Sequence, residues 1–268
     1  MAATASTDPR VAQEEVASPD RAAAAEIEVA GVSKWFGAAG EAPRVLERIS
    51  LAIRHNEFVA LLGRSGCGKT TLLNIIAGLL EPSAGEVRVK QRLVTGPGEG
   101  KGMVFQQHAL FPWLSAQGNV EFGCKSRGMA AGERRARARQ LLELVGLRGF
   151  EDRYPAQLSG GMQQRVAIAR ALALDPDILL MDEPFGALDE FTRIEMQDEL
   201  LRVWSTRKKT VVFVTHSIWE AQVLADRVVV LASSPGRIAE EFEIDLPRPR
   251  SRTDPRLTAL YERIWARL

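Results

Sequence analysis

A glycine-rich loop that holds one lysine and one threonine is the first feature of this chain that could do chemistry. Its sequence is Gly63-Arg64-Ser65-Gly66-Cys67-Gly68-Lys69-Thr70, and it lies between an apolar run that reads as a buried strand, residues 58–62, and an apolar run that reads as a helix, residues 71–78. Glycines at this spacing let backbone N–H groups surround phosphate oxygens. Lys69 can neutralise the β- and γ-phosphates, and the Thr70 hydroxyl can reach Mg²⁺. The loop therefore predicts a nucleotide-phosphate site.

Two adjacent carboxylates, Asp182 and Glu183, follow the apolar run 178–181, and Pro184 ends the segment. The run is typical of a buried parallel strand, and charges at its end are costly unless a divalent cation lies beside them. Neighbouring side chains of a strand point to opposite sides, so we expect different roles for the two acids. Asp182 is predicted to hold Mg²⁺, and Glu183 to face an attacking water as a general base or a polarising group.

A third apolar run, residues 210–215, ends in His216, one of three histidines in the chain. Parallel sheets bind ligands at the carboxyl ends of their strands, which is where this histidine is expected to lie. His216 is therefore predicted to reach the γ-phosphate and order the attacking water, in preference to a purely structural role. His55 and His108 have no comparable setting.

A second possible anion site begins at Ser159-Gly160-Gly161, which precede a helical run predicted over 162–172. The N-terminus of a helix presents unpaired N–H groups and a partial positive charge to anions. The segment therefore predicts a second anion-binding helix N-terminus.

Taken in order, these segments resemble the ATP-binding subunit of ABC transporters over about residues 27–246. Residues 63–70 match the Walker A loop, 158–162 the signature loop, 178–182 the Walker B strand and 186–189 the D-loop, while Gln106, Glu183 and His216 match the Q-loop glutamine, the catalytic glutamate and the switch histidine. Only Met162 departs from the family pattern, which usually has glutamine there. The resemblance implies Mg²⁺-dependent ATP hydrolysis by an ABC-type ATPase.

The resemblance also assigns the site residues. Those implied in catalysis are Lys69, Gln106, Glu183 and His216, and those implied as Mg²⁺ ligands are Thr70, Gln106 and Asp182. Those implied to contact ATP are Phe36, Gly63, Arg64, Ser65, Gly66, Cys67, Gly68, Lys69, Thr70, Thr71, Ser159, Gly160, Gly161 and Asp189. In the family, two copies face each other head to tail, so each ATP would lie between Lys69 of one copy and Ser159 of the other.

The aromatic side chain that stacks on adenine could be Phe36 or Trp35. Phe36 matches the position of the family's A-loop aromatic. An extended segment points Trp35 the other way, toward packing. Phe36 is preferred, although a bulge near Gly37 would break the alternation.

The expected fold is α/β, a RecA-like P-loop core with a mostly parallel sheet, an antiparallel β subdomain and an inserted helical subdomain. We expect a disordered tail over residues 1–25, a nucleotide-binding domain over 26–246 with the helical subdomain at about 111–164, and a C-terminal extension over 247–268. In that extension Asp254 can cap, and Pro255 can start, an amphipathic helix. Its apolar face could pack on the core or form a regulatory or dimer contact.

The composition indicates which partners to expect. The chain has 26% charged and 46% hydrophobic residues and no apolar run long enough to span a bilayer, so membrane association would come through a permease. The balance of 35 basic and 34 acidic residues argues against a nucleic-acid partner. Cys67 and Cys124 form no disulfide pattern, which is consistent with a reducing compartment. Phe111, Pro112 and Trp113 could line a groove for the permease or could pack internally.

Other segments are similar to the nitrate, sulfonate and taurine importer branch, among them residues 110–113, 182–189 and 234–238. This resemblance implies a peripheral subunit on the cytoplasmic face of the inner membrane, linked through the permease to a solute-binding protein. No residue here recognises the solute. The alternatives are a soluble ABC ATPase that acts on DNA or the ribosome, and a module that binds ATP without turnover; the chain lacks tandem cassettes and keeps every catalytic residue.

Overall fold

The strands of the computed structural model form two sheets. The structure describes residues 25–37, 43–98, 100–206, 208–233 and 235–268, so the tail expected over 1–25 lies outside it except for Ala25. The larger sheet has the order β10-β9-β3-β8-β7-β6, with β3 (Phe58–Leu62), β6 (Lys101–Val104), β7 (Ile178–Asp182), β8 (Thr210–Thr215), β9 (Arg227–Ala232) and β10 (Arg237–Glu243). The smaller, antiparallel sheet has the order β2-β1-β4-β5, with β1 (Ala25–Trp35), β2 (Arg44–Arg54), β4 (Ala84–Val89) and β5 (Arg92–Leu93).

The central strands of the larger sheet are buried along their whole length. Strands β3, β7 and β8 consist almost entirely of apolar residues, each of them buried, as expected for parallel strands covered on both faces. Strands β9, β3, β8, β7 and β6 pair in parallel, and only β10 runs antiparallel to its neighbour β9. The carboxyl ends of the five parallel strands therefore share one edge.

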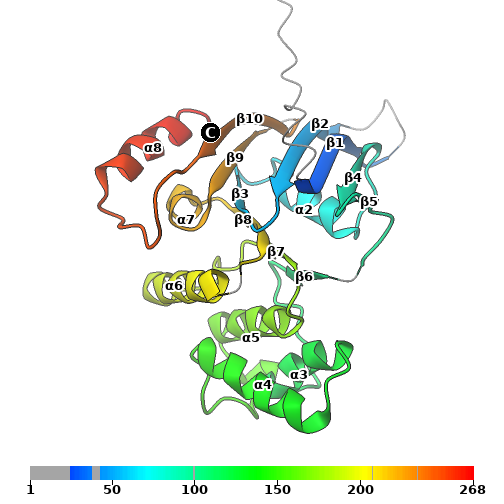
Figure 1. Cartoon of the computed structure of the whole chain (residues 1–268), viewed down its shortest axis with the longest axis vertical. Coiled ribbons are helices and arrows are strands. Elements are labelled where there is room, and N and C mark those ends of the chain that lie inside the picture. Colours follow the sequence, from blue (N-terminus) through cyan, green and yellow to red (C-terminus); the bar gives the residue numbers. More distant parts are fainter. Residues whose placement is uncertain (1–24, 38–42, 99, 207, 234) are drawn as a thin grey trace, which may run out of the picture.

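The helices cover both faces of this sheet (Figure 1). Helix α2 (Lys69–Ala77) lies between the two sheets, where Val59 and Leu61 of β3 face one apolar core. Phe58, Ala60 and Leu62 of the same strand face the other core. That core also contains residues from α6 (Glu190–Thr206), α7 (Ile218–Leu224) and α8 (Pro255–Trp265). The period of two along a strand divides β3 between the two cores.

Three further helices gather at one end of the molecule (Figure 1). They are α3 (Ala116–Ser126), α4 (Ala131–Leu144) and α5 (Gly160–Ala173), with the short 3₁₀ helix η1 (Pro155–Gln157) before α5. Helix α5 begins two residues before the start expected at Met162. This difference lies at a helix end, where capping decides the boundary.

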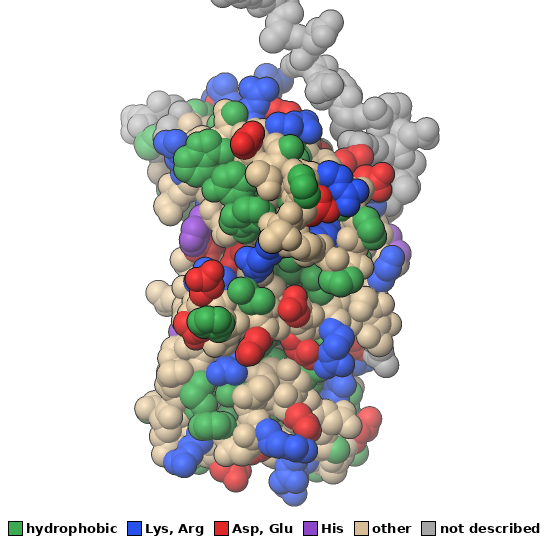
Figure 2. Space-filling view, turned by 90° about the vertical axis from the view of Figure 1, so that its left-hand side faces the viewer, with side chains coloured by type: hydrophobic (Ala, Val, Ile, Leu, Met, Phe, Trp, Pro, Cys, Tyr) green, Lys and Arg blue, Asp and Glu red, His purple; other side chains and the backbone are tan. Residues whose placement is uncertain are grey.

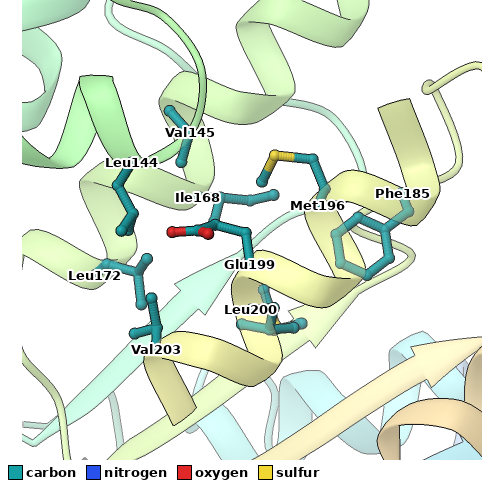
Figure 3. A pocket seen from close by; sticks show the side chains of 10 residues that line it. Leu144, Val145, Ile168, Leu172, Phe185, Met196, Glu199, Leu200 and Val203 are labelled. Carbon is teal, nitrogen blue, oxygen red and sulfur yellow. The ribbon is translucent and has the colours of Figure 1, made fainter. Parts of the chain in front are cut away.

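A narrow apolar crevice separates this helical group from α6 (Figure 3). Ile168 and Leu172 of α5, Met196 and Val203 of α6 and Phe185 line it, and Glu199 contributes a carboxylate. This lining has no positively charged group that could bind a phosphate. The crevice is therefore a packing interface between two parts of the fold. Among the helices of the described residues, none has both the length and the apolar composition needed to span a bilayer.

The C-terminal extension packs on the core, the first of the two outcomes considered above. Helix α8 begins at Pro255, and Asp254 caps it by accepting a hydrogen bond from the N–H of Arg256 at 2.9 Å. Its side chains Leu257 and Ile264 are completely buried. The buried guanidinium of Arg250 donates to the carbonyl oxygens of Gln222 at 2.6 Å and Ala225 at 2.5 Å, and burial lowers the pKa of Arg250 to about 10. The extension therefore holds the C-terminal end of α7.

Truncation of the buried face of α8 should destabilise the whole fold. Ile264→Ala removes buried methyl groups from the core, and we expect a loss of about 2–4 kcal/mol in the free energy of unfolding, measured with urea. Trp265→Ala on the same helix is the matched control, since this side chain is 65% exposed and its loss should cost under about 1 kcal/mol. Equal, small losses for both variants would contradict the packing of α8.

Candidate functional site

The loop between β3 and α2 has a shape that only small residues allow. Gly66 has φ +81 and Gly68, the N-cap of α2, has φ +98, a region that L side chains rarely adopt. At Gly63 a Cβ would lie 2.6 Å from Sγ of Cys67 and 2.7 Å from the carbonyl oxygen of Leu231. The loop can thus wrap closely around a bound group, with the N-terminus of α2 directed at it.

The ammonium group of Lys69 lies over this loop. The side chain is buried, and its Nζ donates hydrogen bonds to the carbonyl oxygens of Gly63 at 2.7 Å and Arg64 at 3.0 Å. Sγ of Cys67 lies 3.9 Å from the same Nζ, and Cys67 is completely buried beneath the loop. A positive charge is therefore held at the loop, where an anion would be bound.

The carboxylate of Asp182 meets the hydroxyl of Thr70, although 112 residues separate them in the chain. Thr70 Oγ1 donates to Asp182 Oδ1 at 3.0 Å, which joins the end of β7 to the first turn of α2. Asp182 is buried, and burial raises its pKa, while the Thr70 bond opposes the rise. A hydroxyl and a buried carboxylate at one point are hard oxygen donors of the kind that Mg²⁺ prefers, so the residues present fit this ion.

Glu183 and His216 form a second pair beside the first. Glu183 Oε2 lies 3.2 Å from His216 Nδ1. Asp182 and Glu183 contact different partners, as expected, but a turn and not strand alternation separates them, because β7 ends at Asp182 and Glu183 has φ 44. The left-handed turn directs the Glu183 side chain, and its N–H donates to the carbonyl oxygen of Val214 at 3.0 Å, which fixes the turn against β8.

Gln106 and Asp189 lie in the neighbouring connections. Strand β6 pairs with β7, Val104 opposite Met181, so exposed Gln106 follows at the same sheet edge as Asp182. Asp189 precedes α6, and its Oδ1 accepts from the N–H of Thr192 at 3.0 Å. That backbone bond lowers the pKa of Asp189, so the carboxylate serves as a cap for α6.

The second loop starts helix α5. Ser159 is its N-cap, and Ser159 Oγ accepts from the N–H of Met162 at 3.3 Å. Ser159 and Gly160 are exposed, and a Cβ on Gly161 would lie 3.1 Å from Leu188 Cδ2. The loop thus packs closely on the segment before Asp189. Figure 1 places α5 with the helical group and α2 between the sheets, so the two loops belong to different parts of the molecule.

The aromatic candidates at the end of β1 differ in exposure. Phe36 is 57% exposed, and Nζ of Lys34 lies 5.2 Å from the centre of its ring. Trp35 is half-buried, and its backbone N–H donates to Ser83 Oγ at 3.3 Å. Phe36 therefore offers the more accessible ring.

Sequence reasoning missed one polar side chain near these residues. Glu220 is buried in α7 and bonds to Thr215, the residue before His216, at 2.5 Å. The signal was present as a carboxylate four residues after His216, in a short helix whose other residues are mostly apolar. A pattern-based search for acids at strand ends passes over it.

Comparisons with known proteins agree with this arrangement. The profile of the ABC transporter family matches residues 46–186. The taurine import ATP-binding protein TauB of Pseudomonas syringae pv. tomato is 51% identical over 209 residues, which cover 78% of this chain and 80% of that protein. The aliphatic sulfonates import ATP-binding protein SsuB of Bacillus cereus is 44% identical over 227 residues, which cover 85% and 89%.

A solved structure gives the same result for the fold. A dimeric ATP-binding cassette in a post-hydrolysis state, bound to ADP and Pi, aligns with a TM-score of 0.75 and 36% identity, covering 84% of this chain and 99% of that one. The expected α/β cassette fold, with its antiparallel sheet and helical group, is thereby confirmed. The geometry of the phosphate loop and the family profile therefore agree. This chain belongs to the ABC transporter family as an ATP-binding protein.

Proposed function

We propose that this chain is the ATP-hydrolysing subunit of an importer for a small sulfonate-type solute such as taurine, and that two copies work with a membrane permease. The observation that carries the proposal is the meeting of two pairs at one sheet edge, Thr70 with Asp182 and Glu183 with His216. The names of the taurine and sulfonate import relatives support the solute class.

In the reaction Glu183 orients a water molecule and accepts its proton during in-line attack on the γ-phosphate of ATP. Nδ1 of His216 faces Glu183, which leaves Nε2 to contact the γ-phosphate. Lys69 turns from the carbonyl oxygens of its own loop to the β- and γ-phosphates, and the loop N–H groups of residues 63–71 hold the phosphates. Phe36 stacks on adenine.

Thr70, Asp182 and Gln106 would hold Mg²⁺ in this site. Their donor atoms are oxygens, and Thr70 and Asp182 already touch. The ion, when bound, neutralises charge that builds up on the phosphate oxygens during the reaction. Before the ion binds, the Thr70 hydroxyl donates a hydrogen bond to the buried Asp182 carboxylate.

The site is completed by a second copy. In one chain Ser159 and Gly160 are exposed and start α5 in the helical group, so their N–H groups are free to face the ATP held by the partner's loop. Asp189 lies in the same interface, as does Leu188, which packs against Gly161. The dimeric cassette bound to ADP and Pi supports this arrangement.

The permease is proposed to dock on an aromatic cluster of the helical group. The ring of Phe111 lies 5.5 Å from that of Trp113 and 4.6 Å from that of Phe122, and Trp113 is 70% exposed. Arg170 lies 5.5 Å from the Phe111 ring and adds a positive charge. Exposed aromatics beside an arginine are typical of protein interfaces. Phe111 thus packs internally, while Trp113 remains available to a partner.

This docking would place the chain as a peripheral subunit on the cytoplasmic face of the inner membrane. A solute-binding protein would act on the permease from the other side.

The nucleotide-binding domain is proposed to span residues 26–246, with the helical subdomain at about 111–164 and the C-terminal extension at 247–268. On the face that Figure 2 shows, acidic and basic side chains are interspersed, which supports the absence of a nucleic-acid partner.

Replacement of Glu183 should separate binding from turnover. Glu183→Gln keeps the shape of the side chain and removes the base, so we expect ATP affinity to stay within about threefold while kcat falls roughly 10²- to 10⁴-fold. Glu195→Gln, an exposed position on α6, is the control and should hydrolyse ATP normally. Phosphate release and equilibrium nucleotide binding measure both quantities, and undiminished turnover in Glu183→Gln would remove this residue from the mechanism.

The proposed contact of Ser159 with the partner's ATP can be tested separately from its role as the N-cap of α5. In the Glu183→Gln background, loss of a hydrogen bond to charged phosphate should cost about 1.5–3 kcal/mol, so Ser159→Ala should weaken ATP-dependent dimerisation at least about tenfold. Ser115→Ala is the matched control, because Ser115 caps α3 by accepting from the Gly118 N–H at 3.2 Å and lies away from both loops in the chain. Light scattering reports the dimer, and equal effects of the two substitutions would contradict the contact in trans.

The aromatic cluster is tested by association with membranes. Trp113→Ala should reduce co-purification of the permease, with a loss of about 2 kcal/mol expected for a central interface tryptophan. ATP hydrolysis by the isolated chain should be unchanged. Trp265→Ala serves as control, since this tryptophan is equally accessible but lies on α8 at the other end of the molecule (Figure 1). Retention of the permease by Trp113→Ala would place the docking surface elsewhere.

A further inference from the structure

Glu220, on α7, contacts two other parts of the fold, the end of β8 and helix α6. Its Oε2 accepts a hydrogen bond from Thr215 Oγ1 at 2.5 Å, at the end of β8. Its Oε1 accepts from Gln197 Nε2 at 3.3 Å and lies 3.8 Å from Nε of Arg193, both on α6. A buried carboxylate is stable only where such partners replace water. Burial raises the pKa of Glu220, while Thr215 and Arg193 favour its charged form.

These bonds hold the segment that carries His216 on both sides. Thr215 donates to Glu220, and Thr215 Oγ1 accepts from the N–H of Ser217 at 3.0 Å. The residue before His216 thus bonds to the carboxylate directly, and the residue after it bonds to the hydroxyl of Thr215. A shift of Glu220 would move the imidazole relative to Glu183, which lies 3.2 Å from it.

The same carboxylate is connected to the segment before Asp189. Arg193, beside Glu220, donates through Nη2 to the carbonyl oxygen of Leu188 at 2.8 Å. Leu188 is the residue whose Cδ2 lies closest to the Cβ position of Gly161 in the second loop. Glu220 therefore lies between the histidine segment and the segment that contacts the Ser159 loop.

Gln197 extends this network to the C-terminal extension. Its side chain is 1% exposed, and its Oε1 accepts from Nη2 of Arg252 at 2.7 Å. The amide orientation is determined by its partners, because a guanidinium can only donate and the ionised carboxylate of Glu220 can only accept. A continuous chain of side chains thus runs from Arg252 through Gln197 and Glu220 to Thr215.

We propose that Glu220 is a positioning residue for His216, and that Arg252 of the C-terminal extension is coupled to the catalytic site through Gln197 and Glu220. The inference rests on the catalytic roles proposed for Glu183 and His216. It makes residues 247–268 part of the control of hydrolysis as well as of the fold. A change in the environment of Arg252 alters the position of His216 and with it the rate of turnover.

The test uses the full chain with three substitutions. Glu220→Gln removes the charge at nearly constant shape, and we expect kcat to fall about tenfold because the histidine is misplaced, while KM for MgATP stays within about twofold. Arg252→Ala should lower kcat about threefold in the native background and have no further effect with Glu220→Gln, since coupled residues are not additive. Arg256→Ala is the matched control, as its side chain bonds only to Asp254 among the described contacts.

Proton NMR of the histidines gives a readout that loss of stability does not move. The chain has three histidines, so the Cε1–H signal of His216 can be assigned by substitution. Glu220→Gln and Arg252→Ala should shift this signal and leave that of His55 in place, because His55 pairs with Glu26 at the opposite ends of the strands. If Glu220→Gln does not fold, Arg252→Ala against Arg256→Ala still decides, since Arg252 is exposed.

The outcomes distinguish this inference from the proposed function. Normal turnover in Glu183→Gln would overturn the catalytic role proposed for Glu183, on which this inference rests. Loss of turnover in Glu183→Gln, with unchanged kcat and an unchanged His216 signal in Glu220→Gln and Arg252→Ala, would overturn only the coupling. Independent, multiplicative losses in the double variant would also overturn it.

Discussion

The rest of the site depends on the register of three parallel strands. In this sheet Leu62 lies opposite Thr215, and Asp182 lies opposite Val214. The phosphate loop, the two acids and His216 therefore each begin within one residue of the same row of backbone hydrogen bonds. A parallel sheet covered on both faces holds this register firmly, because a one-residue slip would turn every buried side chain to the wrong core. Rigid strands thus bring together groups more than 100 residues apart in sequence.

The strand register alone does not determine where the side chains of Glu183 and His216 point. Glu183 reaches His216 because the chain turns through a left-handed residue as soon as β7 ends, and the bond from Glu183 N–H to Val214 holds that turn. Such a conformation costs of order 1–3 kcal/mol and persists only where its surroundings fix it. On the other side, α7 is held by the C-terminal extension through Arg250. The turn thus fixes the backbone at Glu183, and the extension holds the helix that follows His216.

The sequence predicted most of the fold and the location of the site, for reasons that particular residues make clear. Residues 58–62, 178–182 and 210–215 are apolar runs bounded by glycines, proline or polar side chains, and each is a buried strand. The cap of α8 was readable because Asp254 and Pro255 are adjacent. These are local signals, which a single sequence displays directly.

What the sequence did not reveal depends on contacts between distant segments. The turn at Glu183 could not be predicted, because it depends on where β7 stops and on a bond to β8. The contacts of Glu220 with Gln197 and of Gln197 with Arg252 span 23 and 55 residues, and no periodic pattern encodes them. The start of α5 differed by two residues because the Ser159 cap, rather than the apolar periodicity, determines it.

In the proposed assembly one copy holds only part of each ATP site, and a second copy completes it. Specific ATPase activity, measured against chain concentration at saturating ATP and Mg²⁺, tests whether the site is shared in this way. A composite site predicts activity per chain that rises with concentration and then levels off as the dimer forms. Activity per chain that stays constant down to concentrations where light scattering finds only single copies would contradict the claim.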